Sequence, residues 1–175
     1  MKRIGDKGEK MKTIVVAGGC FWGVQAYYKQ LKGVIKTTVG YIDGNKMNPT
    51  YEEVCSGITN HTEACEITYN SNVISLREIC DHLFRISNPF SKFRQGNDVG
   101  KQYRTGIYYN NTEDKNIIDN FMKEYFLDDI GKVRTEVKES KDYSLAENYH
   151  QDYLDKNPYG YCHVDLGLAS NEEKK

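Results

Sequence analysis

The sequence predicts a two-layer α/β fold of the α+β kind, with an irregular C-terminal tail after Pro158. Two observations lead to this prediction. The expected elements follow the order β-α-β-β-α-β, with one more helix and strand after them, which is typical of a ferredoxin-like sandwich. The chain has 175 residues, the usual length of one domain. We expect a single domain over residues 1–175, with a core over about 12–164 and flexible ends at 1–11 and 165–175.

The first three elements follow from hydrophobic periodicity and from the positions of glycine. Residues 13–17 are rich in β-branched side chains and end at Gly18-Gly19, as a short strand does. A helical period follows at once and stops at Gly33, with an apolar face made of Phe21, Val24, Tyr28 and Leu31. Residues 34–41 are predicted to form the second strand.

The third strand and the second helix have the clearest patterns. Residues 62–69 alternate along a strand, which places on one face Glu63, Cys65, Ile67 and Tyr69. Ser75 and Glu78 form a capping-box sequence, a usual start of a helix, and Pro89 ends this helix. Its expected apolar face consists of Leu76, Ile79, Leu83 and Phe84.

Two long loops separate the remaining elements. Residues 43–61 and 87–102 contain several Gly, Pro and Asn residues, and loops of this length are usually functional. Residues 103–109 are predicted to form the fourth strand and residues 133–137 the fifth. The helix between these strands is expected to be capped by Thr112 and to turn inward Ile117, Ile118, Phe121, Met122 and Tyr125.

Composition excludes several classes of protein. The formal net charge is −1, from 24 Lys and Arg against 25 Asp and Glu, so no broad surface for nucleic acid is expected. The longest apolar run, residues 14–24, is too short to span a membrane. Residues 1–10 lack the apolar segment of a signal peptide. We therefore expect a cytoplasmic monomer that binds neither nucleic acid nor membrane.

The five cysteines indicate free thiols. They stand at positions 20, 55, 65, 80 and 162, an odd and scattered set unlike the disulfide framework of a secreted protein. The chain has no C-x-x-C motif, and none of its four histidines has zinc-ligand spacing to a cysteine pair. We expect no bound metal, and the question becomes which thiol reacts.

Cys20 lies where a strand turns into a helix, in the segment Gly18-Gly19-Cys20-Phe21-Trp22-Gly23. The free amides and partial positive charge of a helix N-terminus favour a thiolate, so we expect this position to lower the pKa of Cys20. The alternative is a small buried hydrophobic residue at a tight turn. The segment does not fit a dinucleotide loop, because bulky side chains stand where phosphate must approach. No Arg follows closely enough for a phosphatase-like anion loop.

The same segment resembles the signature of the A-type peptide methionine sulfoxide reductases. Further blocks follow in the order of that family over residues 12–164, namely Pro49-Thr50-Tyr51, His61-Thr62-Glu63-Ala64, Arg94-Gln95-Gly96-Asn97-Asp98-Val99-Gly100, Gln102-Tyr103-Arg104 and Asn157-Pro158-Tyr159-Gly160-Tyr161-Cys162. Asn60, Thr105, Lys101 and Phe90 depart from the family pattern, and the last two are expected near the rim of the pocket.

The resemblance implies an oxidoreductase that reduces methionine-S-sulfoxide, free or in oxidised proteins and peptides, to methionine. In this scheme the Cys20 thiolate attacks the sulfoxide sulfur while Glu63 protonates the oxygen. Cys162 then resolves the resulting sulfenic acid to a disulfide. Thioredoxin or another external dithiol reduces the disulfide, and no bound cofactor is needed.

Glu63 is also a candidate acid on the basis of its neighbours. A carboxyl held against the apolar side chains of its strand face has a raised pKa. The alternative is an exposed Glu at the start of a strand.

The resemblance assigns substrate contacts to five further residues. It implies that the sulfoxide oxygen is bound, directly or through water, by Tyr51, Asp98 and Tyr103. It implies that Phe21 and Trp22 hold the S-methyl group. From the residues alone, Asp98 would be a turn residue and the aromatic side chains would be core.

The other thiols and the histidines are less informative. Cys162 lies in a segment with Gly and Pro that can move toward Cys20, whereas Cys65 and Cys80 are expected to be structural. Cys55 lies in a loop and remains an alternative resolving thiol. No role follows from the spacing of His61, His82, His150 and His163.

Two other functions remain open from the residues. A thiol peroxidase or peroxide sensor would oxidise Cys20 with peroxide instead of a sulfoxide. A binding module would use Phe21, Trp22 and the tyrosines as an aromatic cage for a methylated cation. The reductase is favoured, because a cage needs no thiol at a helix start and a peroxidase needs no aromatic pocket for a methyl group.

Overall fold

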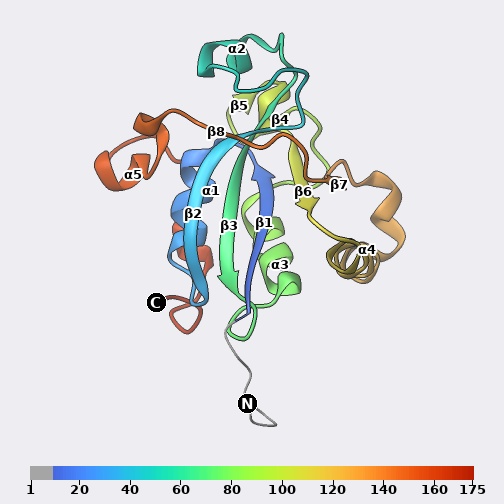
Figure 1. The fold of residues 1–175 in the computed structure, drawn as a ribbon. Helices are drawn as coiled ribbons and strands as arrows, with labels where there is room; N and C mark the ends of the chain where they lie inside the picture. Colours follow the sequence, from blue (N-terminus) through green and yellow to red (C-terminus); the bar gives the residue numbers. More distant parts are fainter. Residues whose placement is uncertain (1–9) are drawn as a thin grey trace, which may run out of the picture.

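A computed structural model describes residues 10–175 and has a six-stranded sheet at its centre (Figure 1). Its strands are β1 (Met11–Gly18), β2 (Val34–Ile42), β3 (Thr62–Asn70), β6 (Thr105–Tyr109), β7 (Glu136–Glu139) and β8 (Ser144–Leu145). They lie in the order β7-β6-β1-β3-β2-β8, antiparallel throughout except for the parallel pair β6 and β7. The order β6-β1-β3-β2 is that of a ferredoxin-like sandwich, so the predicted fold class is confirmed.

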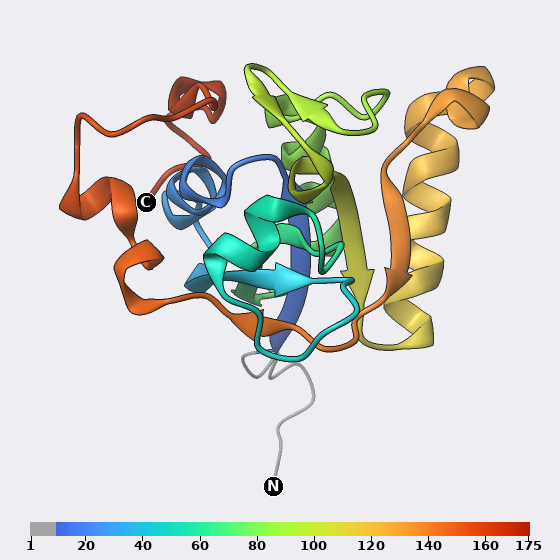
Figure 2. The same cartoon turned by 90° about the horizontal axis from the view of Figure 1, so that it is seen from above.

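Three helices form the second layer: α1 (Phe21–Lys29), α3 (Leu76–Ile86) and α4 (Thr112–Phe126). Figure 2 shows α1 and α3 on the same side of the sheet, with α4 beyond β6 and beside β7. The apolar faces of these helices and of the sheet form the main core. Ser75 caps α3 by accepting the amide of Glu78, as the capping box predicts.

The loop predicted over residues 43–61 contains a short helix, α2 (Tyr51–Ser56). Thr50 accepts the amide of Glu53 through its hydroxyl at 3.2 Å, and Gly57 ends the helix with a positive φ of 78°. These are ordinary helix-capping features, so the prediction of loop throughout was wrong. The chain after β7 crosses the face of the sheet that the helices leave open, and Tyr143 packs there (Figure 1).

Several helices and strands begin or end at other residues than predicted. Helix α1 ends at Lys29, four residues before Gly33. Tyr103 lies in a 3₁₀ turn (Lys101–Tyr103) ahead of β6, not in the strand itself. The second loop contains a small hairpin, β4 (Arg94–Gln95) and β5 (Asp98–Val99). Strand β7 starts at Glu136 rather than at residue 133.

Helix α4 differs from its prediction at both ends. The cap is Asn111, whose side-chain oxygen accepts the amide of Asp114 at 2.8 Å, and Thr112 lies inside the first turn. Tyr125, expected to face inward, is 44% exposed, and Phe126 is buried instead. The apolar stripe is therefore rotated by one position at the end of the helix.

Residues 165–175, expected to be a flexible end, return to the helices. Glu173 accepts the amide of Lys32 through its backbone oxygen at 2.8 Å, and its carboxylate binds Arg85 at 2.8 Å. Met11, also expected in a flexible end, pairs with Asn70 in the sheet. Residues 1–9 lie outside the described part of the chain. Within residues 10–175, no helix has the length and apolar character needed to cross a membrane.

The capping of α4 can be tested directly. Asn111→Ala is expected to lower the free energy of unfolding by about 1 kcal/mol, because the Asp114 amide loses its partner. The midpoint of thermal unfolding should fall by about 2–4 °C. Thr112→Ala is the matched control, and its midpoint should stay near that of the wild type. A larger loss in Thr112→Ala than in Asn111→Ala would contradict this assignment of the cap.

Candidate active site

Cys20 is the N-cap residue of α1, two residues after β1 ends. The turn between them depends on Gly19, whose φ of 94° is a conformation that glycine adopts without steric cost. A Cβ on Gly19 would also lie 2.8 Å from the side chains of Gln95 and His163. The predicted strand-to-helix turn is therefore present, and it places the thiol at the start of the helix.

Glu63 lies near the start of β3, opposite Tyr41 of β2, and is 1% exposed. Its Oε1 accepts the backbone N–H of Phe21 at 3.1 Å. The first amides of a helix have no partner within the helix, so this bond joins β3 to the N-terminus of α1. The alternative of an exposed Glu is excluded by the burial.

Burial raises the pKa of Glu63 from 4.5 to about 8. The amide of Phe21 lowers this pKa and Asp98 raises it, both by less than burial does. The carboxyl is therefore mainly protonated at neutral pH, which agrees with the expected raised pKa.

The expected lowering of the Cys20 pKa is wrong. Cys20 is 7% exposed, and burial raises its pKa above the ordinary value, with a second contribution from Glu63. The amide of Trp22 lowers the pKa, but this effect is smaller. The Glu63 contribution disappears while that carboxyl is protonated. Cys20 thus holds a proton at rest, which must leave when the sulfur attacks.

Asp98 and Tyr103 belong to the same group of side chains. Both interact electrostatically with Cys20 and Glu63. The turn that carries Tyr103 is held against β3 by Thr62, whose hydroxyl donates to the carbonyl oxygens of Gln102 and Arg104. Burial, followed by Glu63, raises the pKa of Tyr103 above its ordinary value, so its hydroxyl is a neutral hydrogen-bond donor.

Tyr51, the first residue of α2, lies near Glu63 and Tyr103. Its backbone N–H donates to Glu147 Oε2 at 3.0 Å, which fixes the start of the helix. Burial raises the pKa of Tyr51, and the neighbouring Cys55 thiol, Glu63 and Tyr103 act on the same hydroxyl. Tyr51 therefore joins the predicted set around Glu63.

Phe21 and Trp22 lie in an aromatic cluster at the start of α1. The Trp22 ring stacks on Tyr153 with a centroid separation of 3.8 Å, and its Nε1–H donates to His150 Nδ1 at 3.0 Å. Phe21 contacts Tyr41 and His150 at ring separations of 5.7 and 5.1 Å. The indole is thus held in one orientation by a stack and a hydrogen bond.

Three residues of this region were not predicted from the sequence. His150 contacts both predicted aromatic residues, Glu147 orients Tyr41 and Tyr51, and the Tyr161 hydroxyl donates to Asp98 Oδ2 at 3.2 Å. No spacing rule connects them to Cys20, because the contacts join the C-terminal tail to elements far away in the sequence. The position of Tyr161 inside a matching block was the one available signal.

The remaining cysteines fall into two groups. Cys65 and Cys80 are fully buried in the main core, as expected of structural residues. Cys162 is partly buried, interacts electrostatically with Cys20, and donates its S–H to the carbonyl oxygen of Val164 at 3.2 Å. Cys55 is exposed beside Tyr51. All five thiols are free.

Neither residue expected at the rim dominates the site. Phe90 packs against Phe126 of α4, with ring centroids 5.7 Å apart, and so lies with that helix. Lys101 is exposed at the start of the turn that carries Tyr103, and its backbone oxygen accepts a hydrogen bond from Arg104. Residues 10–175 contain no group of three or more His, Cys, Asp or Glu side chains placed to hold a metal ion.

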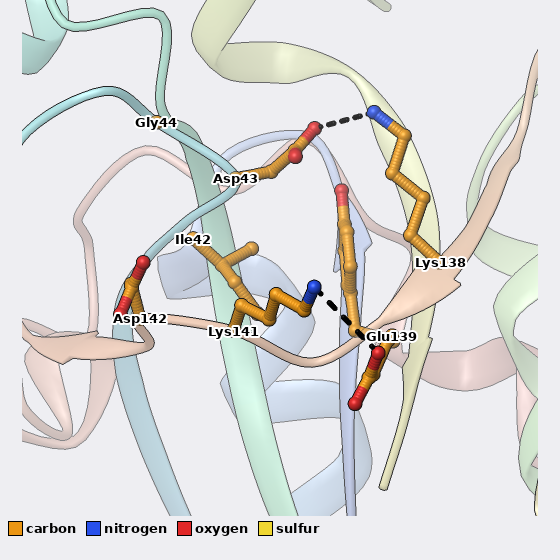
Figure 3. A pocket seen from close by; sticks show the side chains of 8 residues that line it. Ile42, Asp43, Gly44, Lys138, Glu139, Lys141 and Asp142 are labelled. Atoms are coloured by element: carbon orange, nitrogen blue, oxygen red, sulfur yellow. Dashed lines mark hydrogen bonds and ion pairs between the residues drawn. The ribbon is translucent and has the colours of Figure 1, made fainter.

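A surface hollow of about 300 Å³ lies away from these residues (Figure 3). Its charged walls pair with each other, Lys138 with Asp43 at 2.9 Å and Lys141 with Glu139 at 3.7 Å. None of the predicted site residues lines it. The hollow is therefore separate from the thiol and its acid.

A buried thiol and a protonated carboxyl at the same helix start form an arrangement that suits a thiol-dependent enzyme. A family model for peptide methionine sulfoxide reductase matches residues 12–175. A peptide methionine sulfoxide reductase MsrA from Ureaplasma urealyticum is 50% identical over 159 residues, which cover 91% of this chain and 96% of the relative. The chain belongs to the peptide methionine sulfoxide reductase family.

Solved structures agree with this assignment. Mxr1 from Saccharomyces cerevisiae in reduced form aligns with a TM-score of 0.80 and 36% identity, and the alignment covers 92% of each chain. Mxr1 in complex with Trx2 aligns with a TM-score of 0.57 and 26% identity, covering 85% of this chain and 87% of that one. The fold around the site is therefore shared with a known member.

The raised pKa of Glu63 predicts a pH-dependent stability difference. The folded pKa of about 8 lies above 4.5, so the folded state binds more protons than the unfolded state between these values. The wild type should lose stability as pH rises through this window, by up to about 1.4 kcal/mol per pH unit. Glu63→Gln cannot ionise and should lack this loss.

Denaturant unfolding of both proteins near pH 5 and near pH 9 measures the effect. The free energy of unfolding of Glu63→Gln minus that of the wild type should increase with pH. A difference that is the same at both pH values would contradict the raised pKa.

Proposed function

We propose that Cys20 and Glu63 together reduce methionine-S-sulfoxide, free or in oxidised proteins and peptides. One observation carries this proposal: a buried carboxyl that keeps its proton at neutral pH lies at the same helix start as the buried thiol. A sulfoxide is a poor electrophile until its oxygen is protonated or strongly hydrogen-bonded. Glu63 supplies that proton beside the sulfur that attacks.

The first step balances without an outside proton. Glu63 gives its proton to the sulfoxide oxygen, and the Cys20 thiol passes its own proton to Glu63 as the sulfur attacks. The attack forms a bond between the Cys20 sulfur and the sulfoxide sulfur. The oxygen then passes to Cys20 as this S–S bond and the S–O bond of the substrate break, and methionine leaves with a sulfur reduced by two electrons. Cys20 keeps the oxygen as a sulfenic acid, and its sulfur is oxidised by two electrons. Glu63 ends the step protonated, as it began.

The surrounding side chains orient the sulfoxide. We assign Tyr51, Asp98 and Tyr103 to its oxygen, directly or through water, because they surround Glu63 and the tyrosines are neutral donors. We assign Phe21 and Trp22 to the S-methyl group, because they directly follow Cys20 in the chain and the stacked, hydrogen-bonded indole is a rigid apolar surface. A fixed methyl and a fixed oxygen leave one epimer able to present its sulfur to the thiol.

A second thiol completes the cycle. We propose that Cys162 attacks the sulfenic acid, which releases water and forms a disulfide with Cys20. Thioredoxin is the proposed reductant, supported by the solved complex of Mxr1 with Trx2, and another dithiol can replace it. No bound cofactor enters this cycle. We propose that the chain acts as a monomer in the cytoplasm, where its free cysteines stay reduced.

The two other functions lose their support. An aromatic cage needs open ring faces, whereas Tyr153 covers a face of Trp22 and His150 occupies its N–H. A peroxidase does not need the fixed aromatic wall beside Cys20. Membership of the peptide methionine sulfoxide reductase family favours the reductase over these two functions.

Glu63→Gln should slow methionine formation in a single turnover by about 10²–10⁴-fold, the usual contribution of a general acid. Quenched mixing with an S-sulfoxide peptide, followed by mass analysis, measures this rate. Cys20→Ser is the inactive reference for this rate, because it should bind substrate and release no methionine. Glu66→Gln, on the other face of β3, should keep the wild-type rate. Equal rates in Glu63→Gln and the wild type would show that this carboxyl is not the acid.

Cys162→Ser should separate the chemistry from the recycling. It should release one methionine per enzyme at a near wild-type rate, while its turnover with thioredoxin collapses. Dithiothreitol, small enough to reduce the sulfenic acid directly, should restore part of the turnover. Cys55→Ser is the matched control and should turn over normally. Peptide mapping that joins Cys20 to Cys55, Cys65 or Cys80 would overturn the assignment, as would normal thioredoxin turnover in Cys162→Ser.

A further inference from the structure

His163 follows the resolving thiol in the sequence and is tied to the start of the site. Its Nε2 lies 2.9 Å from the carbonyl oxygen of Gly18, the last residue of β1. A carbonyl oxygen can only accept a hydrogen bond, so Nε2 must carry the ring proton. In the neutral ring this leaves Nδ1 with a free lone pair. The fold therefore determines the tautomer of His163.

Nδ1 of His163 is buried and has no hydrogen-bond partner within residues 10–175. A buried acceptor without a partner is energetically unfavourable and calls for an explanation. A structural histidine would need only the bond to Gly18. The second nitrogen is left without a structural role.

The Cys162 sulfur and this nitrogen both border the space beside Gly23 of α1. A Cβ built on Gly23 would lie 3.2 Å from Cys162 Sγ and 3.2 Å from His163 Nδ1. Because Gly23 has no side chain, the space between thiol and ring stays open. In the resting structure the thiol donates instead to the Val164 carbonyl at 3.2 Å. A thiol is a weak donor, so a rotation of its side chain can replace this bond with one to Nδ1.

We propose that His163 is the general base of the resolving step, an inference that rests on the proposed role of Cys162. Nδ1 takes the proton of the Cys162 thiol, and the thiolate attacks the Cys20 sulfur. A sulfur electron pair forms the S–S bond, and the S–O bonding pair leaves with the oxygen. Glu63 gives that oxygen its proton, so water departs. The proton on His163 then returns to Glu63 through solvent, and both groups regain their starting states.

Four titratable groups face this pair. Cys20, the N-cap of α1, and Tyr161 of the tail interact electrostatically with Cys162, and Cys20 also interacts with Glu63 of β3 and Asp98 of β5. Burial keeps Glu63 protonated near neutral pH, and that proton is needed for the leaving oxygen. Base and acid are thus supplied by different residues.

His163→Gln tests the proposal, because its side-chain amide can still donate to the Gly18 carbonyl and offers no base. One equivalent of S-sulfoxide peptide makes the sulfenic acid, and quenched samples give the rates of methionine release and of disulfide formation. Methionine release should stay near wild type. Disulfide formation should slow by roughly 10–30-fold near pH 7, because an unassisted thiol is only a few per cent ionised there.

The pH dependence separates a base from a positioning group. When the sulfenic acid is formed near pH 7 and the sample is then mixed to pH 9.5, hydroxide can remove a thiol proton without a neighbouring base, so His163→Gln should approach the wild-type rate. A deficit of equal size at both pH values, or no deficit near pH 7, would overturn the proposal. Tyr159→Phe, at a fully exposed position of the same segment, is the control and should resolve normally.

Two further variants keep the outcomes distinct. If the loss of the ring perturbs the fold, Gly23→Ala places a methyl group between Sγ and Nδ1 and should also slow disulfide formation near pH 7. An unchanged rate of disulfide formation in Gly23→Ala would contradict the proposal.

Cys162→Ser tests the role on which the inference rests. If it still turns over with thioredoxin, the proposed resolving role fails. If it blocks the disulfide while His163→Gln does not slow it, the role of His163 alone fails.

Discussion

The hydrogen bond from the Phe21 amide to Glu63 Oε1 joins the helix that carries the thiol to the strand that carries the acid. Both ends of this bond are buried, so the two reacting side chains keep their relative positions in a site with little water. The same burial keeps the carboxyl and the thiol protonated. In the proposed reaction Glu63 gives its proton to the sulfoxide oxygen, and Cys20 loses its own proton to Glu63 as it attacks.

The C-terminal tail, which carries Cys162, is anchored to the rest of the protein at two separate points. On one side of Cys162 the tail is held by the stack of Tyr153 on Trp22. On the other side it is held by the ion pair of Glu173 with Arg85. The thiol between these anchors is only partly buried. This division suits a two-stage reaction, because the first stage needs fixed geometry and the second needs a thiol that can turn toward Cys20.

Local patterns were enough to predict the central elements, and tertiary contacts explain what they missed. Strand β3 is encoded by short-range alternation, and the start of α3 by the capping box at Ser75. Glu63 could be proposed from its strand face, and Cys20 from its turn. The direction of the Cys20 pKa shift could not be predicted, because it depends on burial by residues distant in the sequence. His150 could not be predicted for a similar reason, because it and its hydrogen-bond partner Trp22 are 128 positions apart in the sequence.

Infrared difference spectroscopy of the carboxyl group tests the central claim, that Glu63 is protonated in the resting site at neutral pH. The wild type near pH 7 should show the C=O band of a buried protonated carboxyl, sensitive to D₂O and absent from Glu63→Gln. This band should disappear as pH rises through about 8. A band that is missing near pH 7, or that titrates away near 4.5, the ordinary value for Glu, would contradict the account.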